Sequence, residues 1–581
     1  MRPLRGILVL AAGLCCVSAA AFAQHVHGSG PEPQPLNPDS VPLWDSVRTN
    51  VHHPVTDNTR AQAYFDQGLA LIYGFNHLEA VLSFQKAYQL DPGCVMCYWG
   101  KAVALGPNIN LAMDTSRWRQ AAGAIETARG LRPLTTMERA YLDAGAARYL
   151  PLPDFPRVPQ ARLDTLRAQM DSAYARAMAQ VWRLSLAEGH PDLDAGAIAA
   201  EARMDLRPWN QWDLNGNKQP GTDSVLAQLH DVLGRKRDHV GAAHLWIHVF
   251  EGSPWPDSAE WAADTLAGLM PRSGHIVHMP SHIYHRLGRY ADGVRHNQRA
   301  VALDSAYLVF RGMAGRYPMY WAHNHDFLWV SANFGGRRDD AMAAARALES
   351  IASDELISRF YNAQHFLTAR MLVHVRFGEW DQALALPQPK YRYPLGIWHF
   401  GQGMARLRRG DTVAANRHLS ELYAIARGPV RDSIIMGNRA GRLLEIAAGI
   451  LDGEIRSVAR DYGPAIAALR RAVLLQDSLS YDEPPPFPYA ARHSLGAVLL
   501  DAGRAKEAEA VYLCDLGEQI DLCEPVWDPR GSLPQRVNRH NPWSLMGLVT
   551  VMRATWRDPG SVLEDFNRRW GGAPVPPGSR W

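Results

Sequence analysis

VGAAHLWIHVFEGS at residues 240–253 and GHIVHMPSHIYHRLGRYADGVRHNQRAVALDS at residues 274–305 carry two copies of one pattern. The second copy repeats three side chains of the first after 34 residues, so that His244, His248 and Glu251 correspond to His278, His282 and His285. Spacings of three, four and seven residues keep side chains on one face of an α-helix, which turns by about 100° per residue. We therefore expect two neighbouring helices, each with a narrow row of potential metal ligands.

The two copies resemble tetratricopeptide repeats (TPRs), which are helical hairpins with a period of about 34 residues. Gly288 stands where a TPR has its turn glycine, Tyr290 where the second helix begins, and Ala300 where that helix has a small packing residue. Pro271 matches the proline that closes the preceding repeat. In the TPR family the positions of the two rows line a concave groove. The resemblance implies that six imidazoles and one carboxylate converge there, namely those of His244, His248, Glu251, His275, His278, His282 and His285.

The same pattern recurs along the chain. Gly68, Ala80, Phe84, Ala87 and Pro92 match one repeat near the beginning, and AARHSLGAVLLDAGRAKEAEAVY at residues 490–512 matches another near the end. Before the latter, YDEPPPFP at residues 481–488 is expected to form a rigid, polyproline-like connector. The order of these motifs resembles a family of long exported bacterial TPR proteins, a resemblance that implies a fold and no established activity.

We therefore expect an all-α fold, a TPR-type solenoid of helical hairpins that forms a superhelix. Residues 59–305 should hold the N-terminal repeats with irregular insertions and the histidine-rich groove. Residues 306–581 should hold the C-terminal repeats.

The first 23 residues have the features of an export signal: two arginines, an apolar run and the sequence Ala21, Phe22, Ala23, which fits a signal peptidase site. We expect cleavage after Ala23 and a location in the periplasm or outside the cell. Residues 24–58 are expected to be an exposed, flexible linker whose His25 and His27 are solvated.

The amino-acid composition limits which binding partners are expected. The chain of 581 residues is 47% hydrophobic with a formal net charge of +3, a balance that predicts neither a nucleic acid nor an anionic membrane as partner. No later apolar run approaches the roughly 20 residues of a transmembrane span, so no membrane insertion is expected after signal removal. The sequence also lacks the nucleophile-elbow, P-loop and dinucleotide-binding motifs, which disfavours nucleotide and hydride chemistry.

Four cysteines remain after the predicted cleavage, and in an exported protein they suit two local disulfides. The pairs would be Cys94 with Cys97 and Cys514 with Cys523. Free thiols packed between helices are the alternative for Cys94 and Cys97.

A transition metal site is the functional interpretation of the histidine rows, because imidazole is a common protein ligand for zinc, copper and iron. Seven candidate ligands exceed the four of one zinc ion, so some of them would orient other ligands, or the site would hold two ions. His244 and His248 lack the glutamate of an HExxH motif, which excludes the zincin arrangement. Either of two acids is the candidate base of a catalytic version, Glu251 or Asp326. Three further side chains are expected to line the groove: His323, Asp326 and His365.

Other interpretations remain open. Eight of the 23 histidines lie between His239 and His296, where an even spread predicts about two, yet repeats that descend from one duplicated ancestor can share histidines without a ligand between them. A groove without metal could bind a protein or peptide segment, or a small ligand. A kink at Pro280 would turn His275 and His278 away from His282.

Two functions from different classes therefore follow from the sequence. The first is an exported binding or scaffold protein whose concave groove carries a metal-binding histidine cluster. The second is a metal-dependent enzyme, a hydrolase or an oxidase, built in that groove. The fold alone does not choose between them.

Overall fold

The computed structural model describes residues 40–572, except residues 45–46, 48–49, 114, 154–156, 313–316 and 519–536. The predicted signal segment, His25 and His27 lie outside the described residues, as does Cys523.

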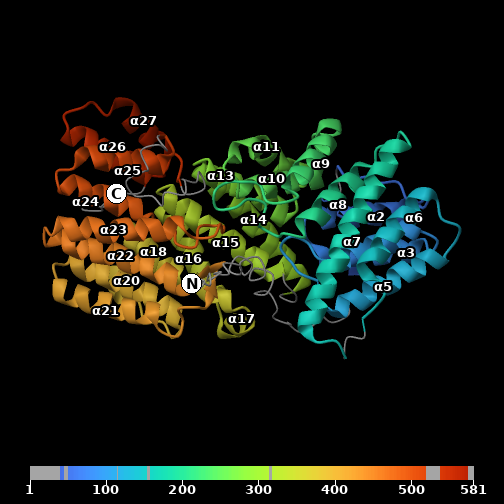
Figure 1. Cartoon of the computed structure of the whole chain (residues 1–581), viewed down its shortest axis with the longest axis horizontal. Coiled ribbons are helices and arrows are strands. Elements are labelled where there is room, and N and C mark those ends of the chain that lie inside the picture. The colour runs from blue at the N-terminus through green and yellow to red at the C-terminus, as the bar shows by residue number, and fades with distance from the viewer. Residues whose placement is uncertain are drawn as a thin grey trace, which may run out of the picture.

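Helices form nearly all of the regular structure in the described part of the chain, and helices that follow each other in sequence pack side by side. Figure 1 shows an elongated molecule in which the chain runs from the blue helices at one end to the red helices at the other. The predicted all-α fold of helical repeats is confirmed.

The helices before the first histidine row are α2 (Thr59–Tyr73), α3 (His77–Leu90), α4 (Val95–Leu105), α5 (Thr115–Gly130), α6 (Thr136–Tyr149), α7 (Gln160–Ala187), α8 (Leu193–Met204) and α9 (Thr222–Arg235). The middle of the chain forms α10 (Val240–Glu251), the 3-10 helix η3 (Pro256–Ala259), α11 (Glu260–Leu269), α12 (Gly274–His278), α13 (Pro280–Arg286), α14 (Tyr290–Arg311) and α15 (Tyr317–Phe334).

The second half begins with α16 (Arg338–Ile351), α17 (Asp354–Arg359), the 3-10 helix η4 (Tyr361–Thr368), α18 (Ala369–Arg376), α19 (Trp380–Ala385), α20 (Arg392–Arg408) and α21 (Thr412–Arg427). A small hairpin of β1 (Ile434–Ile435) and β2 (Asn438–Arg439) follows. The last helices are α22 (Ala440–Val458), α23 (Tyr462–Asp477), α24 (Ala491–Asp501), α25 (Ala505–Leu516), α26 (Pro542–Ala554) and α27 (Gly560–Arg569).

Two large apolar cores meet at the second histidine repeat. The first contains buried residues from Val41 to Leu287, and the second those from Tyr290 to Phe566. Between them, Gly288 makes the predicted turn with a positive φ of 71°, which a residue with a side chain rarely adopts. The sequence predicts a boundary after residue 305, but that position lies inside the continuous helix α14, and the change of core comes about 17 residues earlier.

Residues within the predicted linker are part of the folded structure. Val41 and Val51 are buried, and the Tyr64 hydroxyl on α2 donates to the carbonyl of Val41. The Lys236 ammonium donates to the carbonyl of Asn50. The exposed linker predicted for residues 24–58 is therefore wrong for these positions, because apolar side chains and backbone groups there find partners on α2 and beyond α9.

The cysteine prediction is confirmed for one pair. Cys94 and Cys97 form a disulfide at the start of α4. Cys514 on α25 is also disulfide-bonded, while its predicted partner Cys523 lies outside the described residues.

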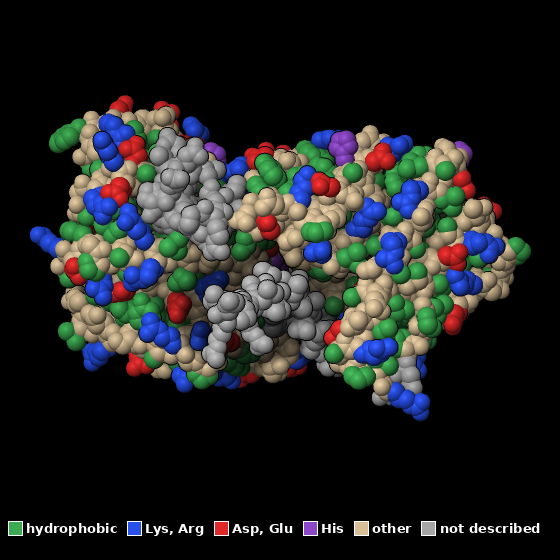
Figure 2. Space-filling view, in the orientation of Figure 1, with side chains coloured by type: hydrophobic (Ala, Val, Ile, Leu, Met, Phe, Trp, Pro, Cys, Tyr) green, Lys and Arg blue, Asp and Glu red, His purple; other side chains and the backbone are tan. Residues whose placement is uncertain are grey.

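The surface carries charges of both signs. On the face in Figure 2, lysines and arginines are interspersed with aspartates and glutamates, and few histidines are visible. Within the described ranges, no helix combines the length and the apolar character that crossing a bilayer requires.

Close approach of helices in the first core depends on two glycines around one phenylalanine. A Cβ atom on Gly100 would lie 2.4 Å from the ring of Phe84, and one on Gly68 would lie 2.8 Å from the same ring. The Phe84 side chain of α3 is fully buried there, so α2 and α4 can approach it only through residues without side chains.

We expect Gly100→Ala to lower the free energy of unfolding by about 1–3 kcal/mol, because the added methyl group overpacks the Phe84 ring. Thermal melting followed by circular dichroism measures the effect. Gly123→Ala is the matched control: a Cβ atom there meets nothing within 4 Å, and exchanging a helical glycine for alanine should stabilise α5 by up to about 1 kcal/mol. Equal melting temperatures for the two variants would contradict this packing.

Candidate metal centre

Three short helices in the middle of the molecule hold the ligands predicted from the two rows. They are α10 with His244, His248 and Glu251, α12 with His275 and His278, and α13 with His282 and His285. In Figure 1, α10 and α13 lie between the N-terminal and C-terminal helices, near α15. All seven side chains are buried, so they lie inside the protein and not on an open groove wall.

Pro280 does not separate the histidines. It is the first residue of α13, where its missing N–H group is tolerated, and Met279 before it keeps helical angles of −50° and −37°. The chain therefore continues from α12 into α13 with His278 Nε2 2.7 Å from His282 Nε2. The kink considered from the sequence, which would turn His278 away from His282, is not observed.

His244, His248 and His275 form what we call the three-histidine site. One ring nitrogen of each lies within 4.8 Å of the others. The rings of all three surround Phe75, with ring centroids 4.6, 5.7 and 5.2 Å from it. The site therefore joins helix α10 to helix α12 beside the turn after α2.

A hydrogen bond fixes the tautomer of one of these rings, and a contact with a carboxyl group orients a second. His244 Nδ1 lies 2.7 Å from the carbonyl oxygen of Tyr73, which only accepts, so Nδ1 carries the proton. His248 Nδ1 lies 2.8 Å from Glu251 Oε1. His244 Nε2 is therefore left with a lone pair. Nε2 of His244, Nε2 of His248 and both nitrogens of His275 have no hydrogen-bond partner among the described residues.

Unpartnered buried nitrogens are costly, at about 1–3 kcal/mol for each polar group that loses its water without a replacement. Metal-binding histidines commonly donate their other N–H group to a carbonyl or a carboxylate, which is the arrangement at His244 and His248. The three-histidine site thus has the free nitrogens and the supporting hydrogen bonds of a metal site.

Burial also keeps these rings in the form that binds metals. It lowers the pKa of His244 to about 4, and together with the neighbouring histidines it lowers the pKa values of His248 and His275 well below the ordinary value. Only the neutral imidazole offers a lone pair, so all three rings are ready to ligate at neutral pH.

A second group of histidines lies next to the first. Ring nitrogens of His278, His282 and His323 come within 4.8 Å of one another, His323 being provided by α15. The rings of His248 and His282 are 6.1 Å apart between centroids, so the two groups are neighbours.

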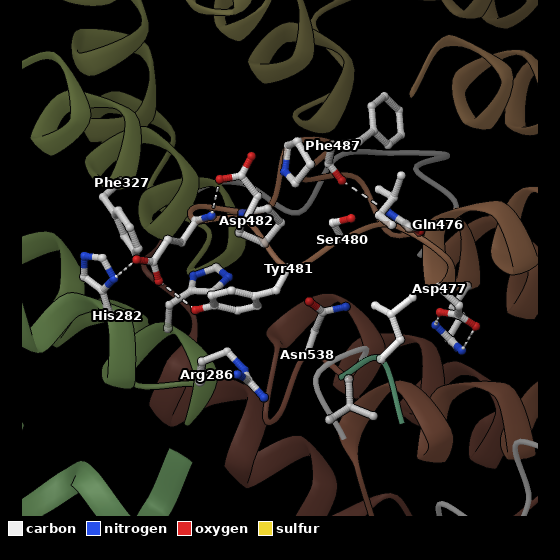
Figure 3. Close-up of a pocket in the computed structure, with 18 residues that line it drawn as sticks. His282, Arg286, Phe327, Gln476, Asp477, Ser480, Tyr481, Asp482, Phe487 and Asn538 are labelled. Atoms are coloured by element: carbon white, nitrogen blue, oxygen red, sulfur yellow. Dashed lines mark hydrogen bonds and ion pairs between the residues drawn. The ribbon is translucent and has the colours of Figure 1, made fainter. Parts of the chain in front are cut away.

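Glu483 is a functional candidate that sequence reasoning missed. It lies in the connector after α23, is buried, and touches His282 Nδ1 with its Oε1 atom. Glu251 Oε2 lies 2.8 Å from the same nitrogen. Figure 3 shows His282, Tyr481 and Arg286 around this contact. The signal in the sequence is the pair Asp482 and Glu483 directly before a run of prolines, but the prolines favour the interpretation of this segment as a rigid connector.

The two carboxyl groups share an unusual environment. Burial raises the pKa values of both Glu251 and Glu483 well above the ordinary range, and neighbouring acids add to the effect. Arg286, beside them, is also buried, and its guanidinium donates to the backbone carbonyls of Glu251 and Ser253.

A cavity of about 610 Å³ opens onto these groups. Its polar wall includes His248, His275, His282, His323, Asp326 and Glu483. Its apolar wall includes Trp209, Met319, Tyr320, Phe360, Phe366 and Met436. Ligand cavities of roughly 300–1,000 Å³ take small organic molecules, and a largely apolar lining with a few polar groups is typical of them.

Asp326, the second candidate base, faces this cavity. Its Oδ1 accepts a hydrogen bond of 2.7 Å from Trp329, while Oδ2 has no partner among the described residues. Burial raises the pKa of Asp326 to about 7, which suits a group that exchanges protons near neutral pH.

Two predicted residues lie apart from the ligand groups. His285 packs against Tyr290 and Phe334, with ring centroids 5.3 Å away in both cases, because it lies one turn beyond His282 and faces the second core. His365 stacks on Tyr393, is buried, and is absent from the residues that line the cavity. Neither belongs to a group of potential ligand atoms within the described part of the chain.

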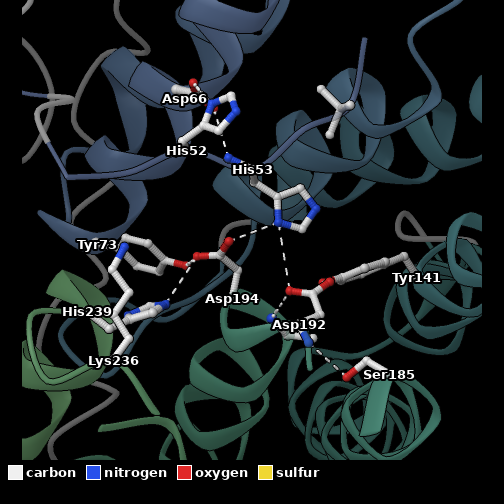
Figure 4. Close-up of polar contacts among 12 residues, drawn as sticks. His52, His53, Asp66, Tyr73, Tyr141, Ser185, Asp192, Asp194, Lys236 and His239 are labelled. Atoms are coloured by element: carbon white, nitrogen blue, oxygen red, sulfur yellow. Dashed lines mark hydrogen bonds and ion pairs between the residues drawn. The ribbon is translucent and has the colours of Figure 1, made fainter. Parts of the chain in front are cut away.

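A third cluster has the spacing of a metal site but a different chemistry. His53, Asp192 and Asp194 bring three ligand atoms within 4.8 Å at the start of α8 (Figure 4). Their carboxylate oxygens are already engaged by donors from His53, Tyr73, Tyr141, Ala195 and His239. Burial lowers the pKa of His53, but the two aspartates outweigh it and raise that pKa to about 9. The cluster is an ion-pair network that attaches residues 50–54 to α8.

No protein-family model matches the chain, and no curated protein matches it. Among solved structures, a chain of the human IFIT1 dimer with m7Gppp-AAAA is similar over 91% of this chain and 98% of its own, with 10% identity and a TM-score of 0.32. A chain of the APC/C hetero-tetramer Cut9-Hcn1 covers 90% of this chain and 88% of its own, with 12% identity and a TM-score of 0.26. A chain of Naa15/Naa10 bound to HypK-THB is similar over 88% of this chain and 77% of its own length, with 11% identity and a TM-score of 0.21. Likenesses of this strength say nothing about function.

The pH dependence of stability provides a test of histidine burial at a position away from the ligand groups. Burial lowers the pKa of His365 from 6.5 to about 4. Between these values the unfolded chain binds a proton that the folded chain does not, so acid favours unfolding. At pH 5 this linkage removes about 2 kcal/mol of stability relative to pH 7.5. We expect His365→Phe to reduce the drop in melting temperature between pH 7.5 and pH 5 relative to the parent.

Tyr393→Phe is the control, because it removes the hydroxyl 3.3 Å from His365 Nδ1 and keeps the buried imidazole. That variant should show the same acid-induced drop as the parent. An unchanged drop in His365→Phe would mean that His365 is not a buried neutral ring.

Proposed function

We propose that this chain is a metalloprotein that binds a transition metal ion through His244, His248 and His275 at the wall of a small-molecule cavity. The observation that supports this most directly is the set of buried ring nitrogens that have no hydrogen-bond partner in the described part of the chain, on rings held in place by Tyr73 and Glu251. A duplicated repeat would by itself account for shared histidines, but not for lone pairs that meet in a buried space.

Zinc, copper and iron are the candidate ions. Each accepts imidazole nitrogen, and the described ligand groups contain no cysteine. A tetrahedral zinc ion with three histidine ligands keeps one position open, which is the ligand number of many catalytic zinc sites. His248 and His275 both line the cavity, so the open position of an ion there would be accessible to a small molecule.

A metal-dependent enzyme, hydrolytic or oxidative, is the second candidate function. Asp326 favours it, because an unpartnered carboxyl oxygen with a pKa of about 7 lies in the wall of the same cavity. A bound ion would polarise a substrate or activate water, and Asp326 would take up or deliver the proton.

A protein or peptide segment in a concave groove, the other occupant expected from the sequence, has less support. The histidine rows are buried, and the cavity beside them has the volume of a small-molecule site. Export to the periplasm or outside the cell remains part of the proposal, and the disulfide of Cys94 with Cys97 is in keeping with an oxidising compartment.

Elemental analysis of protein purified without a polyhistidine tag tests the metal site. We expect at least one equivalent of zinc, copper or iron in the parent. The double variant His244→Phe/His275→Phe should bind that ion at least about 100-fold more weakly while it keeps its helical circular dichroism, because it loses two of three ligands.

His53→Gln is the matched control, since His53 belongs to a cluster of the same spacing whose atoms are already hydrogen-bonded. It should leave the metal content unchanged. A parent that contains no metal and takes up neither zinc, copper nor iron on titration would rule out the proposal.

A further inference from the structure

Three buried atoms of the group around Glu483 face one another. They are His282 Nδ1, Glu251 Oε2 and Glu483 Oε1, and apart from their contacts with one another none has a partner among the described residues. Glu251 Oε2 lies 2.8 Å from the nitrogen, and Glu483 Oε1 is in closer contact with it. We call these three atoms the mixed site, because it joins two carboxylates to one imidazole.

The remaining polar atoms of the same side chains are all engaged. Glu251 Oε1 lies 2.8 Å from His248 Nδ1, and Glu483 Oε2 accepts a hydrogen bond of 2.6 Å from the Tyr481 hydroxyl. His282 Nε2 lies 2.7 Å from His278 Nε2. Each side chain is thus held by one contact and leaves one atom for the mixed site.

A chain of hydrogen bonds determines which nitrogen of His282 carries the proton. Asn297 Nδ2 donates to the carbonyl of Gly293, so its Oδ1 atom faces His278 Nδ1 at 2.6 Å and must accept from it. In a neutral ring, His278 Nε2 then has the lone pair and accepts from His282 Nε2. His282 Nδ1 is therefore left with a lone pair directed at two carboxyl groups.

Lone pairs and carboxylates cannot meet in a buried space unless a cation or a proton lies between them. The Arg286 guanidinium lies near both carboxyl groups, but its hydrogen bonds go to the backbone carbonyls of Glu251 and Ser253 and not to the atoms of the mixed site. In the described structure the Tyr481 hydroxyl satisfies only the far oxygen of Glu483. The mixed site therefore needs either a shared proton or a metal ion between its atoms.

We infer that a second metal ion binds at the mixed site, ligated by Glu251 Oε2, His282 Nδ1 and Glu483 Oε1. Two oxygen ligands and one nitrogen suit zinc, iron(II), cobalt(II) or manganese(II). Ligand atoms about 2.1 Å from a tetrahedral ion lie about 3.4 Å apart, so Glu251 Oε2 and His282 Nδ1, which are 2.8 Å apart, would separate by about 0.6 Å on binding.

The inference deepens the proposed function and rests on it for the role of Glu251. One oxygen of this residue orients His248 in the three-histidine site, and the other ligates the second ion. His248, His275, His282 and Glu483 all line the same cavity, so both ions would face one bound molecule. The structure thereby assigns His278, counted among the ligands from its spacing, to orienting His282.

Metal titration of the full chain tests the second ion. Chelator-treated protein is dialysed against zinc chloride and, separately, cobalt chloride, and bound metal is measured by elemental analysis. We expect two equivalents in the parent. Glu483→Gln keeps the shape of the side chain, and it should bind metal at the mixed site about 100-fold more weakly or worse, so that the second equivalent is lost. His244→Gln should lose the equivalent bound at the three-histidine site and keep the one bound at the mixed site.

Glu379→Gln is the matched control. Glu379 also contacts a histidine, His374, at 2.7 Å, but it lies outside the ligand groups and is paired with Arg338 as well. This variant should bind two equivalents. Circular dichroism of each variant checks that the helical fold is kept.

The outcomes separate the two proposals. One equivalent in the parent that is lost in His244→Gln and kept in Glu483→Gln would overturn the second ion and leave the three-histidine site standing, with a shared proton between Glu251, Glu483 and His282. No bound metal in the parent would overturn both.

Discussion

The structure depends on the burial of imidazole and carboxyl groups where α10 meets α12 and α13. Removing these groups from water is expensive unless each finds a partner, and most do: His244 a carbonyl, His278 an amide and Glu483 a tyrosine hydroxyl. Among the atoms left over, those of His244, His248, His275, His282, Glu251 and Glu483 lie close together. They point to two adjacent positions at the wall of one cavity, and this convergence gives the proposed metal centre its support.

Contrast with the cluster at His53 shows why spacing alone does not define such a centre. Both places gather three potential ligands within the same distance. At His53 the carboxylates are already satisfied by tyrosine hydroxyls and by ion pairing, and the histidine is charged at neutral pH, its pKa being raised to about 9. His244 and His275 are neutral, and His244 Nε2 and both ring nitrogens of His275 have no hydrogen-bond partner among the described residues. Unmet hydrogen-bonding capacity distinguishes a site that can take an ion from one that is complete without it.

The features of the structure that depend on local periodicity could be predicted from the sequence. A repeat of 34 residues correctly predicted helical hairpins, the turn at Gly288 and the meeting of His244 and His248 with His275. It could not predict Glu483, because the contact of this residue with His282 arises from the course of the whole chain and not from any local pattern. The spacing also places His285 in the row of candidate ligands. One turn beyond His282, however, its ring packs against Phe334 and lies apart from the other candidate ligand atoms.

The contact between His282 and Glu483 also bears on how the protein folds. These residues are about 200 positions apart, and they belong to segments on either side of the boundary between the two apolar cores. Closing a flexible loop of that length costs about 5 kcal/mol of chain entropy, which the contacts across the boundary must offset. An ion ligated by residues of both cores would link two halves of the molecule whose helices otherwise gain stability mainly by packing against the helices next to them in sequence. Loading with metal would then make a quasi-one-dimensional array of helices unfold as one cooperative unit.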